Sequence, residues 1–161
     1  MTAPATRTFL SSVVVVLLFG FLSVASAHEY ALAGLKIVHP WTRATPPGAT
    51  TGVAYLRFVN SRSTAMRLTG ATTPVAQRVE IHVMSVDGGV MRMRPEQGLD
   101  IPAQATVELK PGGIHLMLIG LSRPLTQEGM IPLTLVFGSG ETFSIELYVE
   151  AIGAGSSNHD H

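Results

Sequence analysis

Residues 28–152 form a succession of short runs rich in β-branched and aromatic residues, separated by Gly, Pro, Asn and Asp. After residue 27 no stretch has the 3.6-residue periodicity of an amphipathic helix. This pattern is typical of a sandwich or barrel, so we predict a single all-β domain over residues 28–152. Asp87-Gly88-Gly89 predicts a tight hairpin turn. The expected strands are residues 35–39, 52–60, 66–72, 78–86, 90–94, 106–109, 114–118, 131–137 and 142–150.

Residues 1–27 are predicted to be a secretory signal peptide. Arg7 precedes an apolar block at residues 9–24, and the small residues 25–27 follow in an A-x-A pattern. The block has 16 residues, fewer than the roughly 20 needed to cross a bilayer. Cleavage is therefore favoured over the alternative of an uncleaved membrane anchor. We expect a periplasmic or secreted protein with no stable membrane insertion after cleavage.

The composition excludes several kinds of site. The chain has no cysteine, which rules out disulfides, Fe–S clusters, thiolate zinc sites and a cysteine-linked lipid. The usual blue-copper site also needs a Cys ligand. With 11 basic and 11 acidic residues the formal net charge is zero, so the basic excess of a nucleic-acid-binding protein is absent. The candidate ligands for a soft metal ion are therefore the six histidines and seven methionines.

Histidine and methionine occur two residues apart on two of the expected strands. Side chains alternate between the faces of a strand. His82 therefore shares a face with Met84, and His115 shares a face with Met117. In both strands the opposite face carries the valine, isoleucine and leucine side chains expected in a core. Neither pair follows the apolar pattern of its strand.

A set of thioether and imidazole groups indicates a site for monovalent copper. Thioether sulfur is a soft ligand that selects Cu(I), and imidazole binds both copper states. Without carboxylates the set is poorly suited to Mg²⁺ or Ca²⁺, and zinc prefers Cys, His and carboxylate. The alternative is ordinary packing, because Met fills irregular gaps in cores and a single His on a strand is usually a satisfied side chain.

At these residues the sequence resembles the PCu(A)C family of periplasmic copper chaperones. The family pattern is H-x10-M-x21-H-x-M, and His82, Met93, His115 and Met117 have these spacings. The resemblance extends over most of the chain after residue 27. Further segments similar to family landmarks are residues 39–48, 54–56, 60 and 111–118.

The resemblance implies a cupredoxin-like Greek-key β-sandwich or barrel that binds one Cu(I) in an exposed site and is not an enzyme. It implies that His82, Met93, His115 and Met117 are the copper ligands. It also implies delivery by ligand exchange towards the binuclear copper centre of cytochrome c oxidase. The copper acceptor would be a Sco-type thiol protein or an oxidase subunit.

Four further residues are candidate auxiliary ligands outside the family pattern. Met84 and Met91 lie on the expected strands, where packing is the favoured interpretation and auxiliary ligation or copper transfer the alternative. His159 and His161 lie in residues 153–161, which have little apolar content and are expected to form a flexible tail. The two tail imidazoles could bind Cu(II), or they could simply be solvated.

Two other functions are alternatives to that of a copper carrier. A copper oxidase or oxygenase could use His28, which becomes the amino terminus if cleavage follows Ala27. A β-sandwich that binds another protein without any metal is the second alternative. No motif of a hydrolase or a phosphate-binding loop is found in the sequence.

Overall fold

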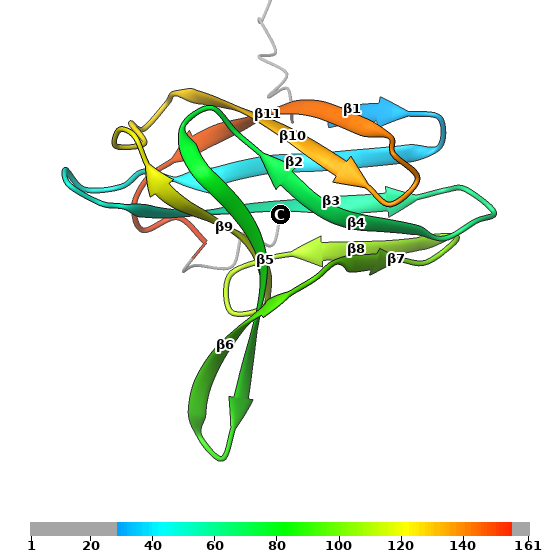
Figure 1. Cartoon of the computed structure of the whole chain (residues 1–161), viewed down its shortest axis with the longest axis horizontal. Coiled ribbons are helices and arrows are strands. Elements are labelled where there is room, and N and C mark those ends of the chain that lie inside the picture. Colours follow the sequence, from blue (N-terminus) through cyan, green and yellow to red (C-terminus); the bar gives the residue numbers. More distant parts are fainter. Residues whose placement is uncertain (1–28, 156–161) are drawn as a thin grey trace, which may run out of the picture.

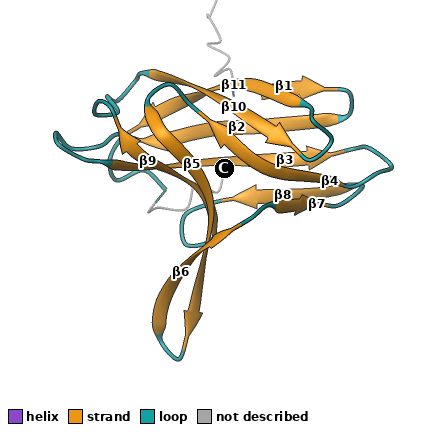
Figure 2. Ribbon diagram, in the orientation of Figure 1, coloured by secondary structure: helices purple, strands orange, loops and turns teal. Residues whose placement is uncertain are grey.

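The computed structural model describes residues 29–155, in which eleven strands and no helix are present (Figures 1 and 2). The expected signal peptide, His28, His159 and His161 lie outside the described residues. Within the described part, no helix is long and apolar enough to cross a membrane. The strands are β1 (Glu29–Leu32), β2 (Leu35–Arg43), β3 (Thr51–Asn60), β4 (Met66–Thr72), β5 (Ala76–Asp87), β6 (Val90–Glu96), β7 (Leu99–Ile101), β8 (Ala105–Leu109), β9 (Ile114–Leu121), β10 (Met130–Phe137) and β11 (Thr142–Glu150).

Seven of the described strands close into a barrel in the order β2-β11-β10-β4-β5-β9-β3, and β3 pairs back with β2. β2 and β11 are parallel, whereas the other neighbours in the ring are antiparallel. β1, β7 and β8 extend the sheet beside β2, β4 and β3, and β6 pairs with β5. The prediction of a single all-β, cupredoxin-like domain is therefore confirmed. Figure 1 shows the β5–β6 hairpin projecting away from the barrel.

Alternating apolar side chains fill the barrel. On β9, Leu116 and Leu118 are fully buried, and on β5 Ile81 is buried against the same core. Burying a large aliphatic side chain stabilises the folded state by about 1.5–3 kcal/mol. The apolar face of each strand therefore points into the barrel. The residues between the apolar positions point to the opposite face.

A bulge interrupts β2 at His39 and Pro40. The register of the β2–β3 pair shifts between Val38 and Trp41, and His39 has a left-handed φ of 48°. Pro40 has no N–H to donate to the ladder. Beyond the bulge, Trp41 pairs with Tyr55 of β3, and the two rings pack with centroids 4.6 Å apart. The bulge thus sets the position of a buried aromatic pair.

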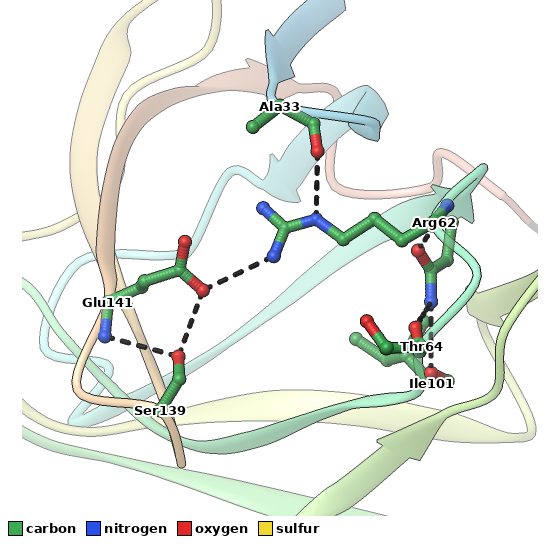
Figure 3. Close-up of polar contacts among 7 residues, drawn as sticks. Ala33, Arg62, Thr64, Ile101, Ser139 and Glu141 are labelled. Carbon is green, nitrogen blue, oxygen red and sulfur yellow. Dashed lines mark hydrogen bonds and ion pairs between the residues drawn. The ribbon is translucent and has the colours of Figure 1, made fainter.

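Arg62 connects three turns of the barrel (Figure 3). Its Nε donates to the Ala33 carbonyl between β1 and β2, and its guanidinium pairs with Glu141 between β10 and β11 at 3.3 Å. Ser139 Oγ also donates to Glu141. Hydrogen bonds from Ser139 and Arg62 hold the pKa of Glu141 below its usual value. Beside this network, buried Asn60 donates to the carbonyls of Thr64, Ile101 and Pro102.

Candidate metal centre

His82 and His115 are brought together by the register of β5 and β9. They are direct partners in this antiparallel ladder, so their side chains lie on the same face. The ring centroids are 5.8 Å apart and the ring planes are inclined by 53°. Two residues separated by 33 positions in the sequence thus form one imidazole pair.

Each imidazole has one nitrogen bound to the protein and one without a partner. His115 Nδ1 lies 3.1 Å from the Gly113 carbonyl, which can only accept, so this nitrogen carries the proton. His82 Nε2 lies 2.9 Å from a carboxylate oxygen of Glu80. The remaining nitrogens, His115 Nε2 and His82 Nδ1, are buried with no hydrogen-bond partner. Buried polar atoms are rarely left unpaired, and a metal-binding His commonly donates its other nitrogen in this way.

Local electrostatics favour a neutral imidazole at His115. Burial lowers the pKa of His115, and the neighbouring His82 acts in the same direction, while the Gly113 carbonyl opposes them. The pKa of Glu80 is lowered by hydrogen bonds from His82 and from Arg78, whose Nε lies 2.7 Å away. Glu80 therefore remains a carboxylate that orients His82. A neutral imidazole is the form that binds metal ions.

The two methionines of the family pattern lie on the same face as the imidazoles. Met117 follows His115 by two residues on β9. Met93 of β6 is the direct partner of Met84, which follows His82 by two residues on β5. All four predicted ligands therefore occupy one face of the adjacent strands β6, β5 and β9. Among residues 29–155 no group of three His, Asp or Glu side chains that could hold a metal ion is found.

Aromatic rings cover one side of the imidazole pair. The ring of Tyr55 lies 6.4 Å from that of His115, and Trp41 packs against Tyr55. The Arg43 guanidinium carbon lies 5.6 Å from the centroid of the Tyr55 ring. Burial raises the pKa of Tyr55, and the charge of Arg43 opposes this shift. This cover leaves His115 only 2% exposed although it lies on the face opposite to the leucines of β9.

The auxiliary candidates have different surroundings. Met91 is 67% exposed and does not pack against the core, so the packing interpretation is wrong for this residue. Met84 is half-buried and also does not pack against the core. The first three residues of the expected tail, 153–155, form a turn in which the Ala154 carbonyl accepts a hydrogen bond from Arg43 Nε at 2.6 Å.

Sequence reasoning assigned no role to Glu80, which binds His82. The signal was present, because Glu80 lies two residues before His82 and so shares its face. The Gly113 carbonyl was also missed. This carbonyl reaches His115 because of the conformation of the turn that precedes β9, and side-chain alternation does not predict that conformation.

The sequence matches a protein family and an individual protein. Residues 35–149 match the family described as "LpqE-like: Putative lipoprotein LpqE-like". The chain is also 31% identical over 127 residues to "Putative lipoprotein Lxx21020" of Leifsonia xyli subsp. xyli (strain CTCB07), covering 78% of this chain and 75% of that protein.

Solved structures of copper proteins share the fold. The copper-bound PCuAC domain from PmoF2 is 32% identical, with a TM-score of 0.66 and coverage of 77% of this chain and 98% of the domain. The Cu(I) form of DR1885 from Deinococcus radiodurans is 27% identical, with a TM-score of 0.59 and coverage of 83% and 87%. Together with the sequence matches, these similarities show that the chain belongs to the LpqE-like proteins of the PCu(A)C family.

Proposed function

We propose that this protein is an exported copper carrier that binds one Cu(I) and passes it to an acceptor protein. The ion would be held by the unpaired nitrogens of His82 and His115 together with the sulfurs of Met93 and Met117. The pair of buried nitrogens without partners is the observation that carries this proposal. The copper-bound PmoF2 domain and the Cu(I) form of DR1885 support it, because both share the fold of this chain.

The donor set suits a soft monovalent ion. Two thioethers and two neutral imidazoles bring no negative charge, and thioethers select Cu(I). Glu80 is the nearby carboxylate, but it is engaged by His82 and Arg78 and acts as an orienting partner. We propose Cu(I) as the cargo and a carrier rather than an enzyme as the function.

Release would proceed by ligand exchange at the exposed side of the site. Met93 is 46% exposed, whereas His115 is almost fully buried. An incoming thiolate would therefore displace the Met93 thioether first and the imidazole of His115 last. We propose a Sco-type thiol protein or a subunit of cytochrome c oxidase as the acceptor, with the binuclear copper centre as the destination.

We further propose that the protein reaches the periplasm or the exterior through the signal peptide at residues 1–27. The lipoprotein names of the family and of the Leifsonia protein support export. These 161 residues contain no cysteine, so a cysteine-linked lipid has no attachment point in them. Release after signal-peptide cleavage is the form of export that fits this sequence.

Cu(I) competition with bicinchoninate tests the metal site. The double variant His115→Ala/Met117→Leu should lose binding of the ion, whereas the matched variant His39→Ala/Met130→Leu should retain it. His39 and Met130 carry the same groups outside the site. X-ray absorption of the copper-loaded protein should show Cu(I) with both nitrogen and sulfur neighbours. Equal affinity in the two double variants, or a spectrum without sulfur, would overturn the proposal.

A further inference from the structure

The β5–β6 hairpin carries methionines outside the barrel core. Figure 1 shows its tip extending away from the barrel, and all seven residues of β6 are exposed. Met91 and Met93 are 67% and 46% exposed. By contrast, Met66 on β4 packs against the core. Packing therefore explains Met66 but leaves the methionines of the hairpin without a structural role.

The register gathers three thioethers on one face of the hairpin. Met84 is the direct partner of Met93, and Val86 is the direct partner of Met91. Direct partners have Cβ atoms about 5 Å apart, and diagonal neighbours such as Met84 and Met91 are about 7–8 Å apart. Methionine has three rotatable side-chain bonds, so its sulfur can move across such distances. We call Met84, Met91 and Met93 the hairpin methionines.

Between His82 and the tip of the hairpin, this face carries no charged side chain. Towards the tip it consists of the hairpin methionines and Val86. Arg92 and Arg94 alternate with the methionines along β6 and belong to the other face. An uncharged group of thioethers would discriminate against divalent ions that require oxygen ligands and would accept a soft monovalent ion.

We propose that the hairpin methionines form a second, weaker Cu(I) position, through which copper passes between the histidine site and an acceptor. This inference rests on the proposed function. Met93 belongs to both positions. As the ion moves outward, its bonds to the imidazole nitrogens and to Met117 break, and bonds to the sulfurs of Met84 and Met91 form. Copper remains Cu(I), no electron moves, and the freed nitrogens keep their lone pairs.

The weaker affinity follows from the ligands. The outer position lacks imidazole and lies in a more exposed part of the chain, where each thioether competes with solvent and with its own rotamer freedom. A weak outer position suits transfer, because a thiolate can replace thioethers one at a time. The exposed side chain of Met91 would be the first that an acceptor meets.

Methyl NMR of the full chain with ¹³C-methyl methionine tests the outer position, with Ag(I) as a diamagnetic probe of similar softness. The first equivalent should shift the methyls of Met93 and Met117. A second equivalent should shift those of Met84 and Met91, while Met66 and Met130 serve as internal controls. If Met84 and Met91 do not respond while Met117 does, the inference is wrong and the proposed function stands. If Met117 also does not respond, the proposed function itself fails.

Transfer kinetics test the role of the outer position. In Met84→Leu/Met91→Leu the equilibrium affinity for the first Cu(I) should stay within about twofold. Release to a bicinchoninate or thiol acceptor should slow by about tenfold, equivalent to about 1.4 kcal/mol in the barrier. Met66→Leu/Met130→Leu is the matched control and should release copper at the normal rate. An unchanged rate in Met84→Leu/Met91→Leu would overturn the transfer role.

Discussion

His82 and His115 lie directly opposite each other on β5 and β9, and each directs a hydrogen bond from one ring nitrogen to a fixed protein oxygen. The two oxygens differ in kind. His82 is oriented by the Glu80 side chain, whereas His115 is oriented by the Gly113 backbone carbonyl. Mutation can therefore remove the support of one imidazole and leave that of the other intact.

Glu80→Ala should weaken Cu(I) binding by about tenfold, because loss of a hydrogen bond to a ligating His typically lowers metal affinity 10- to 100-fold. His82 would lose the partner of its Nε2 and with it a preferred tautomer and orientation. Competition with bicinchoninate measures the effect. Glu108→Ala removes an exposed carboxylate on β8 and should leave the affinity unchanged. An unaltered affinity in Glu80→Ala would show that the orienting bond has no role.

Tyr55→Ala should lower the free energy of unfolding of the metal-free protein by about 3 kcal/mol, as expected for removing a buried aromatic ring. The change leaves a cavity between Trp41 and His115, both of which contact the ring. Urea denaturation measures it. Tyr55→Phe keeps the ring and should lose about 1 kcal/mol or less. Similar losses in the two variants would contradict the packing role.

Glu141 should make the stability of the protein depend on pH in the acidic range. Its pKa is lowered in the folded chain, so the unfolded chain binds that proton more readily. The contribution is therefore present above the ordinary carboxyl pKa of about 4.3 and is lost as the pH falls through and below that value. Calorimetry from pH 6 to pH 3 should show that Glu141→Gln lowers the Tm at pH 6 and that the difference shrinks towards pH 3.

Ser139→Ala is the companion variant for Glu141. It removes one of the two hydrogen bonds that lower the pKa and keeps the Arg62 pair, so it should reproduce part of the effect. A Tm difference between wild type and Glu141→Gln that is constant over the whole pH range would contradict this account.

Gly89→Val should weaken copper binding because it strains the backbone of the hairpin turn, while the barrel is unaffected. Gly88 and Gly89 have φ values of 57° and 81°, and left-handed backbone costs a residue with a Cβ about 1–2 kcal/mol. No atom lies within 4 Å of an added Cβ, so the cost is confined to the backbone. Fraying of the turn would loosen Met93 and lower Cu(I) affinity by up to about tenfold. Gly89→Asn, which tolerates this conformation better, should bind nearly normally.

Much of the fold could be predicted from local pattern. The strands predicted over residues 66–72 and 142–150 begin and end where β4 and β11 do, and the turn residues Gly138-Ser139-Gly140 precede the second of them. β1 and β7 were missed because they have only four and three residues, too few for alternation to be recognised. Closure of the barrel was also beyond local pattern, since the parallel pairing of β2 with β11 joins distant parts of the chain.

The candidate site, like the fold, could be predicted only in part from local pattern. Alternation placed His82 with Met84 and His115 with Met117, and the structure has both pairs on the faces expected. His82 and His115 meet because β5 pairs with β9, although β6, β7 and β8 lie between these two strands in the sequence. The family spacing implied this pairing, but alternation alone could not predict it. The cover over His115 depends on the β2 bulge, which fixes where Trp41 and Tyr55 lie.

The two-residue turn at Gly88 and Gly89 makes the ten-residue spacing between His82 and Met93 a geometric requirement. Adding or deleting a single residue on β6 between the turn and Met93 would rotate that thioether to the side of the arginines. Relatives that keep the metal site should therefore tolerate length changes here only in pairs of residues, even though the loop is open to solvent. In this hairpin, side chains outside the methionine face can vary, but the length can change only by an even number of residues.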